Sequence, residues 1–434
     1  MAIRDDVKEM KLVSPYVAST TIEVRNRALE AVAKALGNHA DEIFAQNKID
    51  LAKAEEDGVP APVVKRLKFD DNKLRDVQSG IRQLQELPDP LGRVTLHRMM
   101  DEGLELTRVT TPIGVIGVIF EARPDAMVQI ASLCIKSGNC AILKGGKETA
   151  NTNRYLFSVI EKAVVDCGYP KGALLLAETH SEIDELLQCD REVDLLIPRG
   201  SNQFVRYIMD HTKIPVMGHA DGICHIYVDE AADQEAAIRI ILDAKMQYTA
   251  ACNAVETLLV HKKIAEEFLP RLCKALAENG IRMNAAGQAA QIMEKCRAQM
   301  EGASVEKVEV EDFKEYLDLV VSVGVVDDVD AAIAHINRYG SHHTDAILTG
   351  DDAAAERFMQ LVDSAGVYRN CSTRFSDGFR YGFGAEVGIS TGKLHARGPV
   401  GLEGLVTYKY KLTGNGQIVG DYASGRAQFH FRDI

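Results

Sequence analysis

The sequence predicts an α/β protein with two doubly wound parallel sheets, to which a small β hairpin and a tail are added. Short apolar segments alternate with helical segments after residue 112, which is typical of parallel strands joined by crossover helices. A chain of 434 residues is too long for one hydrophobic core, so two or three domains are expected. Alternating polarity at 92–110 and from 405 onward predicts exposed strands.

The composition limits the compartment and the partners. The chain is 46% hydrophobic and 26% charged, and no apolar run approaches the ~18 residues that span a membrane. Its net charge of −13 argues against nucleic acid or an anionic membrane as the main partner. Nine scattered cysteines without C-x-x-C pairs, and no signal-peptide core at the N-terminus, predict reduced thiols in the cytoplasm.

The first ninety residues are predicted to be helical. They are rich in alanine and charge, and apolar side chains such as Val24, Ala28 and Val32 recur on one face. Turn residues at 57–60 interrupt this pattern, and the prolines at 88 and 90 end it. A hairpin with its turn at 101–103 follows, and we expect it to contact another subunit.

From residue 112 the pattern changes to buried strands and helices. The segment 113–120 is almost wholly apolar, as expected of a central parallel strand. Pro124 begins a helix that Gly138 ends. The next predicted elements are a strand at 140–144, a helix at 149–167, and strands at 173–177 and 193–198.

A phosphate-binding turn is predicted after the strand 193–198. Gly200 and Ser201 begin a helix there, so their backbone N–H groups could hold an anion. The G-x-G-x-x-G fingerprint of dinucleotide-binding proteins is absent, although the predicted sheet is of the right kind.

Cys252 is the candidate nucleophile. It lies in a loop of small residues between a predicted helix, with Ala237 and Ile241 on one face, and a predicted buried strand at 256–261. A thiol at such a corner can be exposed, with backbone N–H groups nearby to stabilise an oxyanion. The alternative is a buried structural cysteine, because free cysteine is among the most buried residue types.

Three histidines within nine residues, His335, His342 and His343, raise the question of a metal site. Their spacing lacks an H-x-x-x-H pair and a carboxylate at helical spacing, so we expect no metal site there. The segment 374–399 is rich in glycine, serine, histidine and arginine; it is either an anion-binding loop or a solvated one. The polar tail is expected to be mobile near its end.

The sequence resembles the aldehyde dehydrogenase superfamily over nearly the whole chain and, within it, the γ-glutamyl phosphate reductase family. The resemblance rests on five segments: 111–125, 140–148, 252–261, 326–347 and 384–399. It implies an aldehyde dehydrogenase-like fold, with an NADP-binding domain at 1–90 and 111–218 and a catalytic domain at 219–400. It also implies an oligomerisation hairpin and tail at 91–110 and 401–434, in a dimer or a tetramer.

The resemblance implies an NADPH-dependent reduction of L-glutamyl 5-phosphate to glutamate 5-semialdehyde and phosphate, the second step of proline biosynthesis. Cys252 would attack the acyl phosphate, and hydride would reduce the resulting thioester. Only about 110 residues precede Pro112, so the substrate is expected from a separate glutamate 5-kinase, and a transient complex with it is plausible.

One departure from ordinary aldehyde dehydrogenases concerns water. Those enzymes activate water with a glutamate, and ungapped matching puts that place at Gly218. An enzyme that exchanges its thioester only with phosphate should lack such a base. Asp221 lies three residues on, so a gap in the matching would change this interpretation.

The resemblance also implies the cofactor residues. Lys144 matches the lysine at the adenosine ribose, followed by Gly145, and Glu315 matches the glutamate that holds the nicotinamide ribose. Lys147 stands where NAD-preferring members often carry a glutamate, and a cation there favours NADP. Gly200 and Ser201 complete the predicted cofactor set.

The substrate's phosphate needs local cations in an acidic protein. Arg123 matches the superfamily's oxyanion asparagine, which leaves the donor that assists the Cys252 N–H undecided. We predict that Arg123 and Arg397 bracket the phosphate, that His395 donates a hydrogen bond, and that Asn253 also binds substrate. The alternative is that an arginine pairs with Glu386 or Asp377 and only orders the loop.

Two other functions compete with this interpretation. One is an NAD-dependent enzyme that oxidises an aldehyde to a free acid; Gly218 and Lys147 argue against it. The other is a binding protein on a decayed enzyme fold, against which the retained Cys252, Lys144 and Glu315 argue.

Overall fold

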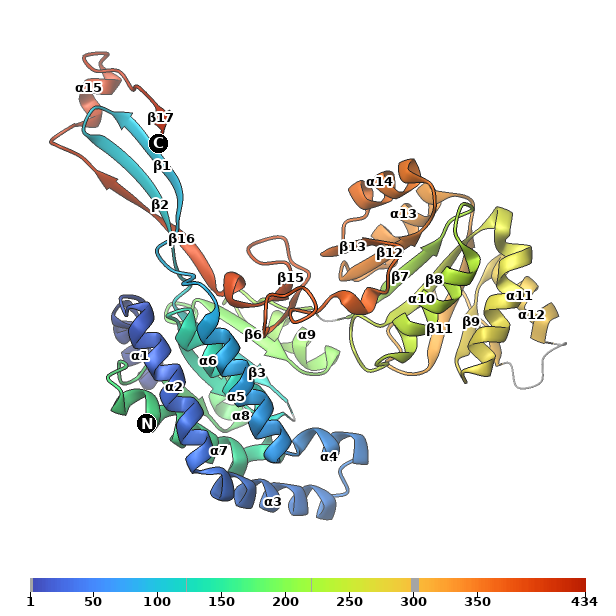
Figure 1. The fold of residues 1–434 in the computed structure, drawn as a ribbon, viewed down its shortest axis with the longest axis horizontal. Helices are drawn as coiled ribbons and strands as arrows, with labels where there is room; N and C mark the ends of the chain where they lie inside the picture. Colours follow the sequence, from blue (N-terminus) through green and yellow to red (C-terminus); the bar gives the residue numbers. More distant parts are fainter. Residues whose placement is uncertain (1–2, 122, 220, 298–303) are drawn as a thin grey trace. The chain divides into compact units, whose positions relative to one another are not determined.

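The computed structural model describes residues 3–121, 123–219, 221–297 and 304–434. The chain folds into two compact units (Figure 1). Unit 1 comprises Met1–Gly218, Phe383–Gly388 and Val400–Ile434, and unit 2 comprises His219–Gly382 and Ile389–Pro399. Residues 383–388, which the sequence interpretation gave to the catalytic domain, are therefore part of unit 1.

The N-terminal region of unit 1 is helical, as predicted. Thr21 and Asp70 cap two of the helices by accepting hydrogen bonds from backbone N–H groups of the first turn. The predicted interruption at 57–60 separates the third helix from the fourth. The helices are α1 (Ile3–Ala18), α2 (Ile22–Asn38), α3 (Ala40–Glu56), α4 (Ala61–Leu67) and α5 (Asp71–Glu86).

The parallel sheet of unit 1 has the strand order β5-β4-β3-β6. Its strands are β3 (Val115–Phe120), β4 (Cys140–Lys144), β5 (Leu174–Ala177) and β6 (Leu195–Arg199). The crossover elements are α6 (Pro124–Lys136), η1 (Lys147–Thr149), α7 (Ala150–Asp166) and α8 (His180–Leu186), and α9 (Asn202–Asp210) follows β6. The strand order reverses between β3 and β6, and in doubly wound folds the crevice at such a point is the usual ligand site.

The helices pack around this sheet in layers. The helix α1 contacts β3, β4, β5 and α8. The helices α6 and α7 contact each other, and α2 packs on both of them and on α5. The strand β3 is fully buried, which explains its continuous apolar sequence.

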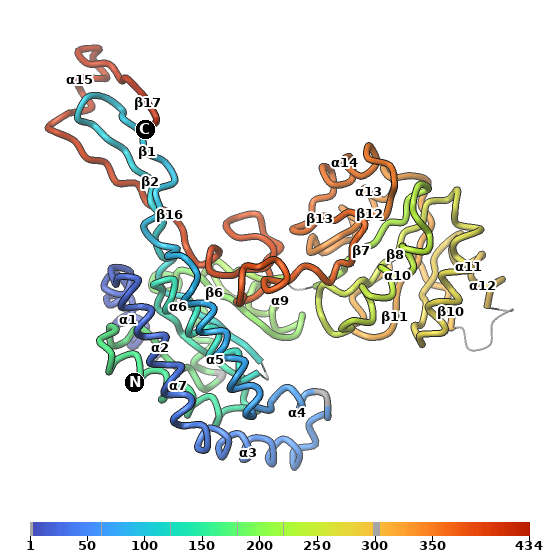
Figure 2. Tube along the Cα trace, viewed as in Figure 1, coloured from blue at the N-terminus to red at the C-terminus, as the bar shows by residue number. Residues whose placement is uncertain are grey.

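The predicted hairpin and the C-terminal tail form one antiparallel sheet in unit 1, with the order β16-β2-β1-β17 (Figure 2). Its elements are β1 (Val94–Asp101), β2 (Leu104–Pro112), β16 (Val406–Thr413) and β17 (Arg432–Asp433), with η4 (Leu402–Leu405) before β16 and α15 (Val419–Ala423) before β17. The tail is thus paired rather than loose: Tyr422, Phe429 and Phe431 stack in series, and Arg98 binds Asp433. These aromatic contacts were not predicted, because the glycine content of the tail gives no sign of them.

Unit 2 is built on a seven-stranded parallel sheet with the order β10-β9-β11-β8-β7-β12-β13. The strands are β7 (Cys224–Val228), β8 (Val255–His261), β9 (Arg282–Ala285), β10 (Val305–Lys307), β11 (Val320–Val326), β12 (Thr344–Leu348) and β13 (Gly366–Arg369). The helices are α10 (Gln234–Met246), α11 (Lys262–Glu278), α12 (Gly287–Arg297), α13 (Val329–Tyr339) and α14 (Asp352–Leu361), with short turns η2 (Val310–Asp312) and η3 (Thr373–Phe375).

Alternating side chains divide between the two faces of this sheet. Ile226 and Val228 join a core under α10, α11 and α12, whereas Tyr227 between them joins a core under α13 and α14. All seven residues of β8 are buried, which confirms the predicted buried strand. The predicted loop region 374–399 contains the short strand β14 (Gly388–Ser390) and the start of its partner strand β15 (Gly398–Val400).

All nine cysteines are free thiols, in agreement with the expectation of reduced cysteines. Across the described ranges, no helix has the length and apolar character needed to cross a membrane.

Candidate active site

The amino ends of three neighbouring strands in unit 2 bring the nucleophile and two histidines together. Cys252 precedes β8, His219 precedes β7, and His343 directly precedes β12. The sheet order β8-β7-β12 and the parallel direction of these strands place the three preceding loops at one edge. The side chains offer ligand atoms that all lie within 4.8 Å of one another.

His343 is positioned to accept the proton of Cys252. Its Nε2 lies 3.2 Å from the Cys252 Sγ, and its Nδ1 lies 2.9 Å from the Oγ1 of Thr344. The His343 ring is fully buried and meets the ring of His219 edge-on, at 5.0 Å between centroids. A nucleophile next to an imidazole that is itself held by a third group is the arrangement that activates a thiol.

The Cys252 loop forms a tight turn closed by the Ala254 N–H donating to the Ala251 carbonyl at 2.9 Å. This hydrogen bond leaves the N–H groups of Cys252 and Asn253 outside the turn's own bonding, so they can point at an oxyanion. Gly222 packs against the turn so closely that an added Cβ would lie 2.7 Å from the Cys252 Cβ.

A second thiol, Cys224, lies beside the nucleophile but differs in chemistry. Its Sγ donates to the Cys252 carbonyl oxygen at 3.3 Å, and burial raises its pKa well above the usual range. Cys252 is partly exposed and contacts an imidazole. Of the two, only Cys252 has the accessibility that a reactive thiolate requires.

Asn253 joins the turn to the segment 372–376. Its Nδ2 donates to the Ser376 carbonyl at 2.7 Å, and its own carbonyl accepts from the Thr373 hydroxyl at 2.7 Å. The Asn253 side chain is buried, and its Oδ1 has no protein partner. One of the two N–H groups of this amide therefore holds the loop, and the contact of Asn253 with substrate stays a prediction.

Arg374 brings a buried cation toward the nucleophile. Its Nε donates to Gln247 at 2.9 Å, and its guanidinium lies over the Tyr248 ring at 6.0 Å. Burial lowers the pKa of Arg374, as does the neighbouring Arg380, while Cys252 acts in the opposite direction. From the sequence, Arg374 was only the first residue of a loop region that is either anion-binding or solvated.

Arg397, a predicted phosphate ligand, is held by Asp363. Its Nη1 lies 3.1 Å from the Asp363 Oδ1, its Nη2 donates to the Asp363 carbonyl, and its buried Nε has no protein partner. Lys393 also binds Asp363, and the hydrogen bond from Lys393, followed by that from Arg397, lowers the pKa of this carboxyl. His395 is exposed and has a φ of 78°, a left-handed conformation that non-glycine residues rarely adopt.

Arg123, the other predicted phosphate ligand, lies in unit 1 at the start of α6. Its Nη2 is 2.8 Å from Asp125, whose carboxylate is buried and also contacts Lys73 at 3.4 Å. Burial would raise the pKa of Asp125, but the two cations outweigh it and the pKa is lowered. Both predicted arginines thus hold carboxylates, those of Asp125 and Asp363.

The predicted cofactor residues after β4 differ in exposure. Lys144 is buried, and its Nζ donates to the Gly145 carbonyl at 2.5 Å. Burial lowers the pKa of Lys144, and Glu148, Glu182 and Glu178 act in the opposite direction. Gly145 has no room for a side chain, because a Cβ would lie 2.0 Å from the Asn153 amide. Lys147 begins η1 and is exposed.

Gly200 and Ser201 follow β6 at the point where the strand order reverses, which suits a dinucleotide. The Ser201 N–H donates to the carboxylate of Glu121 at 3.0 Å, and a Cβ on Gly200 would lie 2.7 Å from the same oxygen. The Glu121 carboxylate therefore already accepts from the Ser201 N–H, the group at the start of α9 that was predicted to bind phosphate. This fits the expected preference of the helix N-terminus for negative charge.

Glu315 precedes β11, the strand next to β8. Two residues on, the Leu317 N–H donates to the Glu256 carboxylate at 3.3 Å, and Leu317 has a φ of 54°. Glu256 also binds Lys245 at 2.7 Å, and both side chains are fully buried. The Leu317 hydrogen bond to Glu256 therefore ties the segment that carries Glu315 to the start of β8, and Lys245 holds the Glu256 carboxylate in place.

The three clustered histidines have separate environments. The His342 Nδ1 lies 2.6 Å from the Asp363 carbonyl oxygen, and the ring of His335 packs against those of His225, Phe313 and Tyr339. Only His343 reaches Cys252. Sequence reasoning missed the pairing, although His343 lies in a segment that carried the resemblance; nothing in the sequence marked His219.

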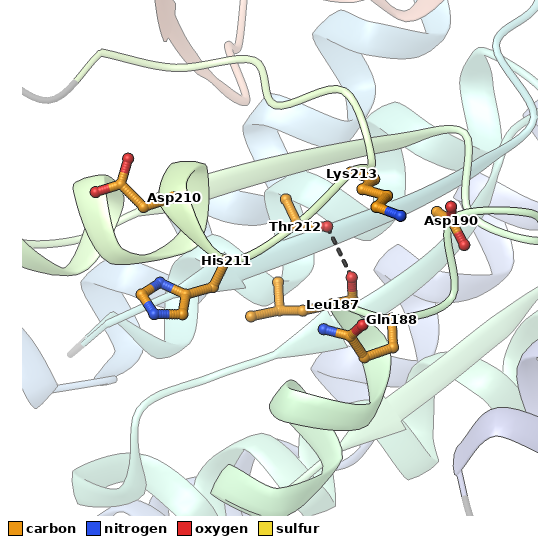
Figure 3. A pocket seen from close by; sticks show the side chains of 7 residues that line it. All are labelled: Leu187, Gln188, Asp190, Asp210, His211, Thr212 and Lys213. Carbon is orange, nitrogen blue, oxygen red and sulfur yellow. Dashed lines mark hydrogen bonds between the residues drawn. The ribbon is translucent and has the colours of Figure 1, made fainter.

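A cavity of about 300 Å³ lies in unit 1 where α8 and α9 end (Figure 3). It is lined by Leu187, Gln188, Asp190, Asp210, His211, Thr212 and Lys213. The Thr212 hydroxyl donates a hydrogen bond to the Leu187 carbonyl. The His211 ring contacts the Tyr207 carbonyl through Nδ1 and stacks on the Tyr207 ring, so these polar groups already make contacts within the fold. The cavity contains none of the predicted site residues.

Comparison with known proteins places these features in a family. The sequence profile of the aldehyde dehydrogenase family matches residues 2–318. This chain belongs to the aldehyde dehydrogenase family. The γ-glutamyl phosphate reductase of Pelotomaculum thermopropionicum is 54% identical, with 100% of this chain and 98% of that protein covered, and the one from Acetivibrio thermocellus is 52% identical, with 99% and 97% covered.

A solved member of the family has the same fold. The crystal structure of γ-glutamyl phosphate reductase from Thermotoga maritima superposes with a TM-score of 0.92 and 36% identity, covering 96% of this chain and 100% of that one. The predicted aldehyde dehydrogenase-like α/β fold is therefore confirmed, as is the resemblance to γ-glutamyl phosphate reductases.

Proposed function

We propose that this aldehyde dehydrogenase reduces L-glutamyl 5-phosphate to L-glutamate 5-semialdehyde and phosphate, using NADPH, as the second step of proline biosynthesis. The names of the relatives, at 54% and 52% identity over the whole chain, support the substrate. The observation that carries the mechanism is the Cys252–His343 contact of 3.2 Å at the amino edge of the unit 2 sheet.

The first half of the reaction follows from this geometry. His343 accepts the thiol proton, and the thiolate of Cys252 attacks the acyl carbonyl. The Cys252 and Asn253 N–H groups donate to the developing oxyanion, and its collapse breaks the bond to phosphate and leaves a thioester. NADPH, when bound, would supply the hydride that reduces the thioester carbon. Collapse of the resulting thiohemiacetal oxyanion breaks the carbon–sulfur bond and releases the aldehyde, and His343 returns the proton to the Cys252 thiolate.

The structure offers a cofactor site of suitable chemistry in unit 1. Gly200 and Ser201 lie at the switch point, where doubly wound sheets bind dinucleotides, and the Ser201 N–H already holds a carboxylate. Lys144 and Gly145 end the neighbouring β4, and exposed Lys147 would contact the 2′-phosphate of NADP. Glu315 would hold the nicotinamide ribose.

The phosphate of the substrate needs cations, and three arginines are candidates. Arg123 and Arg397 would each have to exchange a carboxylate for phosphate, whereas Arg374 is fixed by an uncharged glutamine. Arg→Lys keeps the charge and loses the fork, so a phosphate ligand should show a raised KM for phosphate with an unchanged KM for NADP. If Arg123→Lys and Arg397→Lys leave the phosphate KM unchanged and Arg374→Lys raises it, Arg374 replaces them in the proposal. His395→Asn tests the added donor in the same assay.

The deciding experiment is the phosphate requirement of the reverse reaction. Gly218 stands at the matched place of the water-activating glutamate and carries no base. Semialdehyde oxidation should therefore form the thioester once and stall without phosphate, giving at most one NADPH per site. Steady turnover without phosphate or arsenate would instead favour the rival function, oxidation of an aldehyde to a free acid.

We also propose that the β16-β2-β1-β17 sheet serves subunit contact in a homo-oligomer. Tyr408, Tyr410 and Leu412 are more than half exposed on β16, an unusual number of large apolar groups for one edge strand. Replacing two of these apolar side chains, with Tyr408→Ser and Leu412→Ser, should lower the mass of the oligomer measured by light scattering.

A further inference from the structure

We infer that His219, Cys252 and His343 form a binding site for one Zn²⁺ ion in the substrate-free protein, and that the ion reversibly blocks the nucleophile. The binding itself rests on the geometry alone, while the inhibition rests on the proposed role of Cys252. One thiolate and two imidazoles are ligands that favour zinc over the hard cations Mg²⁺ and Ca²⁺.

The spacing of the three side chains suits a tetrahedral ion. Zinc–nitrogen and zinc–sulfur bonds of about 2.0–2.3 Å separate ligand atoms by roughly 3.3–3.6 Å. The Sγ of Cys252 lies 3.2 Å from the His343 Nε2, and all three ligand atoms lie within 4.8 Å of one another. Small side-chain rotations are therefore enough to close the site.

Both imidazoles are also oriented as metal ligands usually are. The His219 Nδ1 lies 3.0 Å from the Ile389 carbonyl oxygen, and the His343 Nδ1 lies 2.9 Å from the Thr344 hydroxyl. Such hydrogen bonds hold the ring in place and make its other nitrogen the ligand. The three residues come from three separate loops at the sheet edge, which fixes them independently.

Three protein ligands leave the fourth position of the ion for water. His219 and Cys252 are only partly buried, so an ion can enter from solvent. Binding converts the Cys252 thiol to a thiolate and releases its proton to solvent, so affinity should rise with pH. The same sulfur cannot then attack an acyl phosphate, and a thioester on it excludes the ion.

The test uses Co²⁺ as a spectroscopic probe and Zn²⁺ for competition on the full chain. Wild-type protein should bind one Co²⁺ with a thiolate-to-cobalt charge-transfer band that Zn²⁺ abolishes. His219→Gln should weaken Co²⁺ binding at least ten-fold, because even loss of a ligand's hydrogen-bonding partner typically costs 10–100-fold. Cys252→Ser should lose the band, and Cys371→Ser, at another partly exposed thiol, should keep it.

A second measurement needs no variant and no turnover. Zn²⁺ should slow alkylation of Cys252 by iodoacetamide, followed on its peptide by mass spectrometry, while leaving Cys371 unprotected. Absence of the band, its retention in His219→Gln, or unprotected Cys252 would each overturn the site. Loss of activity in chelator-treated enzyme would overturn the inhibitory role alone. Inactivity of Cys252 towards acyl phosphate would overturn the proposed function and with it the inhibitory role, but not the binding site.

Discussion

The two parallel sheets of this protein place their candidate residues at opposite edges. In unit 1, Lys144, Gly200 and Ser201 follow the strands β4 and β6, at the carboxyl edge where α/β sheets usually bind ligands. In unit 2, Cys252, His343 and Glu315 precede the strands β8, β12 and β11, at the amino edge. The same architecture therefore supports two kinds of site.

A difference in local structure explains the contrast. The carboxyl edge of unit 1 leads into the N-terminus of α9, where backbone N–H groups and the helix dipole suit an anion such as phosphate. The amino edge of unit 2 follows helix C-termini, so it lacks those donors, and its chemistry comes from side chains and from one tight turn at 251–254. Anion binding and nucleophilic chemistry thus have separate structural sources.

The largest expected effect comes from the nucleophile. Cys252→Ser should lower kcat by roughly 10³-fold or more, since an alcohol replaces a thiolate, while NADPH binding, which we assign mainly to unit 1, should be retained. Stopped-flow reduction assays and fluorescence titration with NADPH measure the two quantities. Cys371→Ser is the matched control, and a mutant retaining near wild-type turnover would exclude the covalent mechanism.

Removing the base should have the next largest effect. His343→Ala should lower kcat/KM by roughly 10²–10³-fold at neutral pH, with partial recovery at higher pH as the thiol ionises without assistance. A pH–rate profile separates this role from structural damage. His342→Asn, at a position with a φ of 59° that asparagine tolerates, should leave the profile unchanged. A pH-independent loss in His343→Ala would make the ring a packing element.

At the carboxyl edge of unit 1, charge reversal should alter cofactor choice. Lys147→Glu should raise the KM for NADP over that for NAD by roughly ten- to a hundred-fold, because one or two charge-assisted hydrogen bonds are lost. Initial rates with both cofactors measure the ratio. Lys171→Glu, also exposed in unit 1, controls for net charge, and an unchanged ratio would mean that Lys147 faces elsewhere.

The fold and the loop that carries Cys252 could be predicted from the sequence, whereas the side chains that surround Cys252 could not. The buried strand at 255–261 and the small residues before it mark the Cys252 loop, because periodicity and turn residues act locally. His343 lies 91 residues from Cys252, and only the order β8-β7-β12 brings them together. No local pattern encodes that order.

The partners of the ion pairs could not be predicted from the sequence either. Arg397 and Asp363 are 34 residues apart and meet because a loop returns to β13, so the sequence could mark Arg397 as cationic but not show what it holds. The Glu121 contact with Ser201 likewise joins the ends of two strands that are neighbours only in the folded sheet.

Acid sensitivity should distinguish unit 2 from unit 1. Burial lowers the pKa of His335 to about 4, with His225 adding to the effect and Asp345 opposing it. Because this folded-state pKa lies below the unfolded value of 6.5, stability present above pH 6.5 is lost as the pH falls towards 4. His335→Phe should remove this dependence, worth roughly 1–2 kcal/mol at pH 5.

Urea unfolding at pH 7 and pH 5 measures that difference. His211→Phe, at an exposed ring in unit 1, controls for the loss of a histidine. If wild type and His335→Phe lose the same stability between the two pH values, another group governs the acid response.

The smallest expected effect concerns Glu121, which occupies the predicted phosphate donor. Its carboxylate accepts from the Ser201 N–H at 3.0 Å, so cofactor phosphate would have to displace a like charge. Glu121→Gln keeps an acceptor for the N–H and removes the charge, so the Kd for NADPH should fall two- to five-fold, on the order of 1 kcal/mol or less. The gain should shrink as salt is raised, because screening weakens the repulsion that the substitution removes.

Glu55→Gln, which removes an exposed carboxylate on α3, controls for net charge, and isothermal titration gives the Kd of both variants for NADPH. A weaker rather than tighter complex would mean that Glu121 contacts the cofactor itself, and the carboxyl edge of unit 1 would then recognise its ligand through an acceptor as well as through the α9 donors.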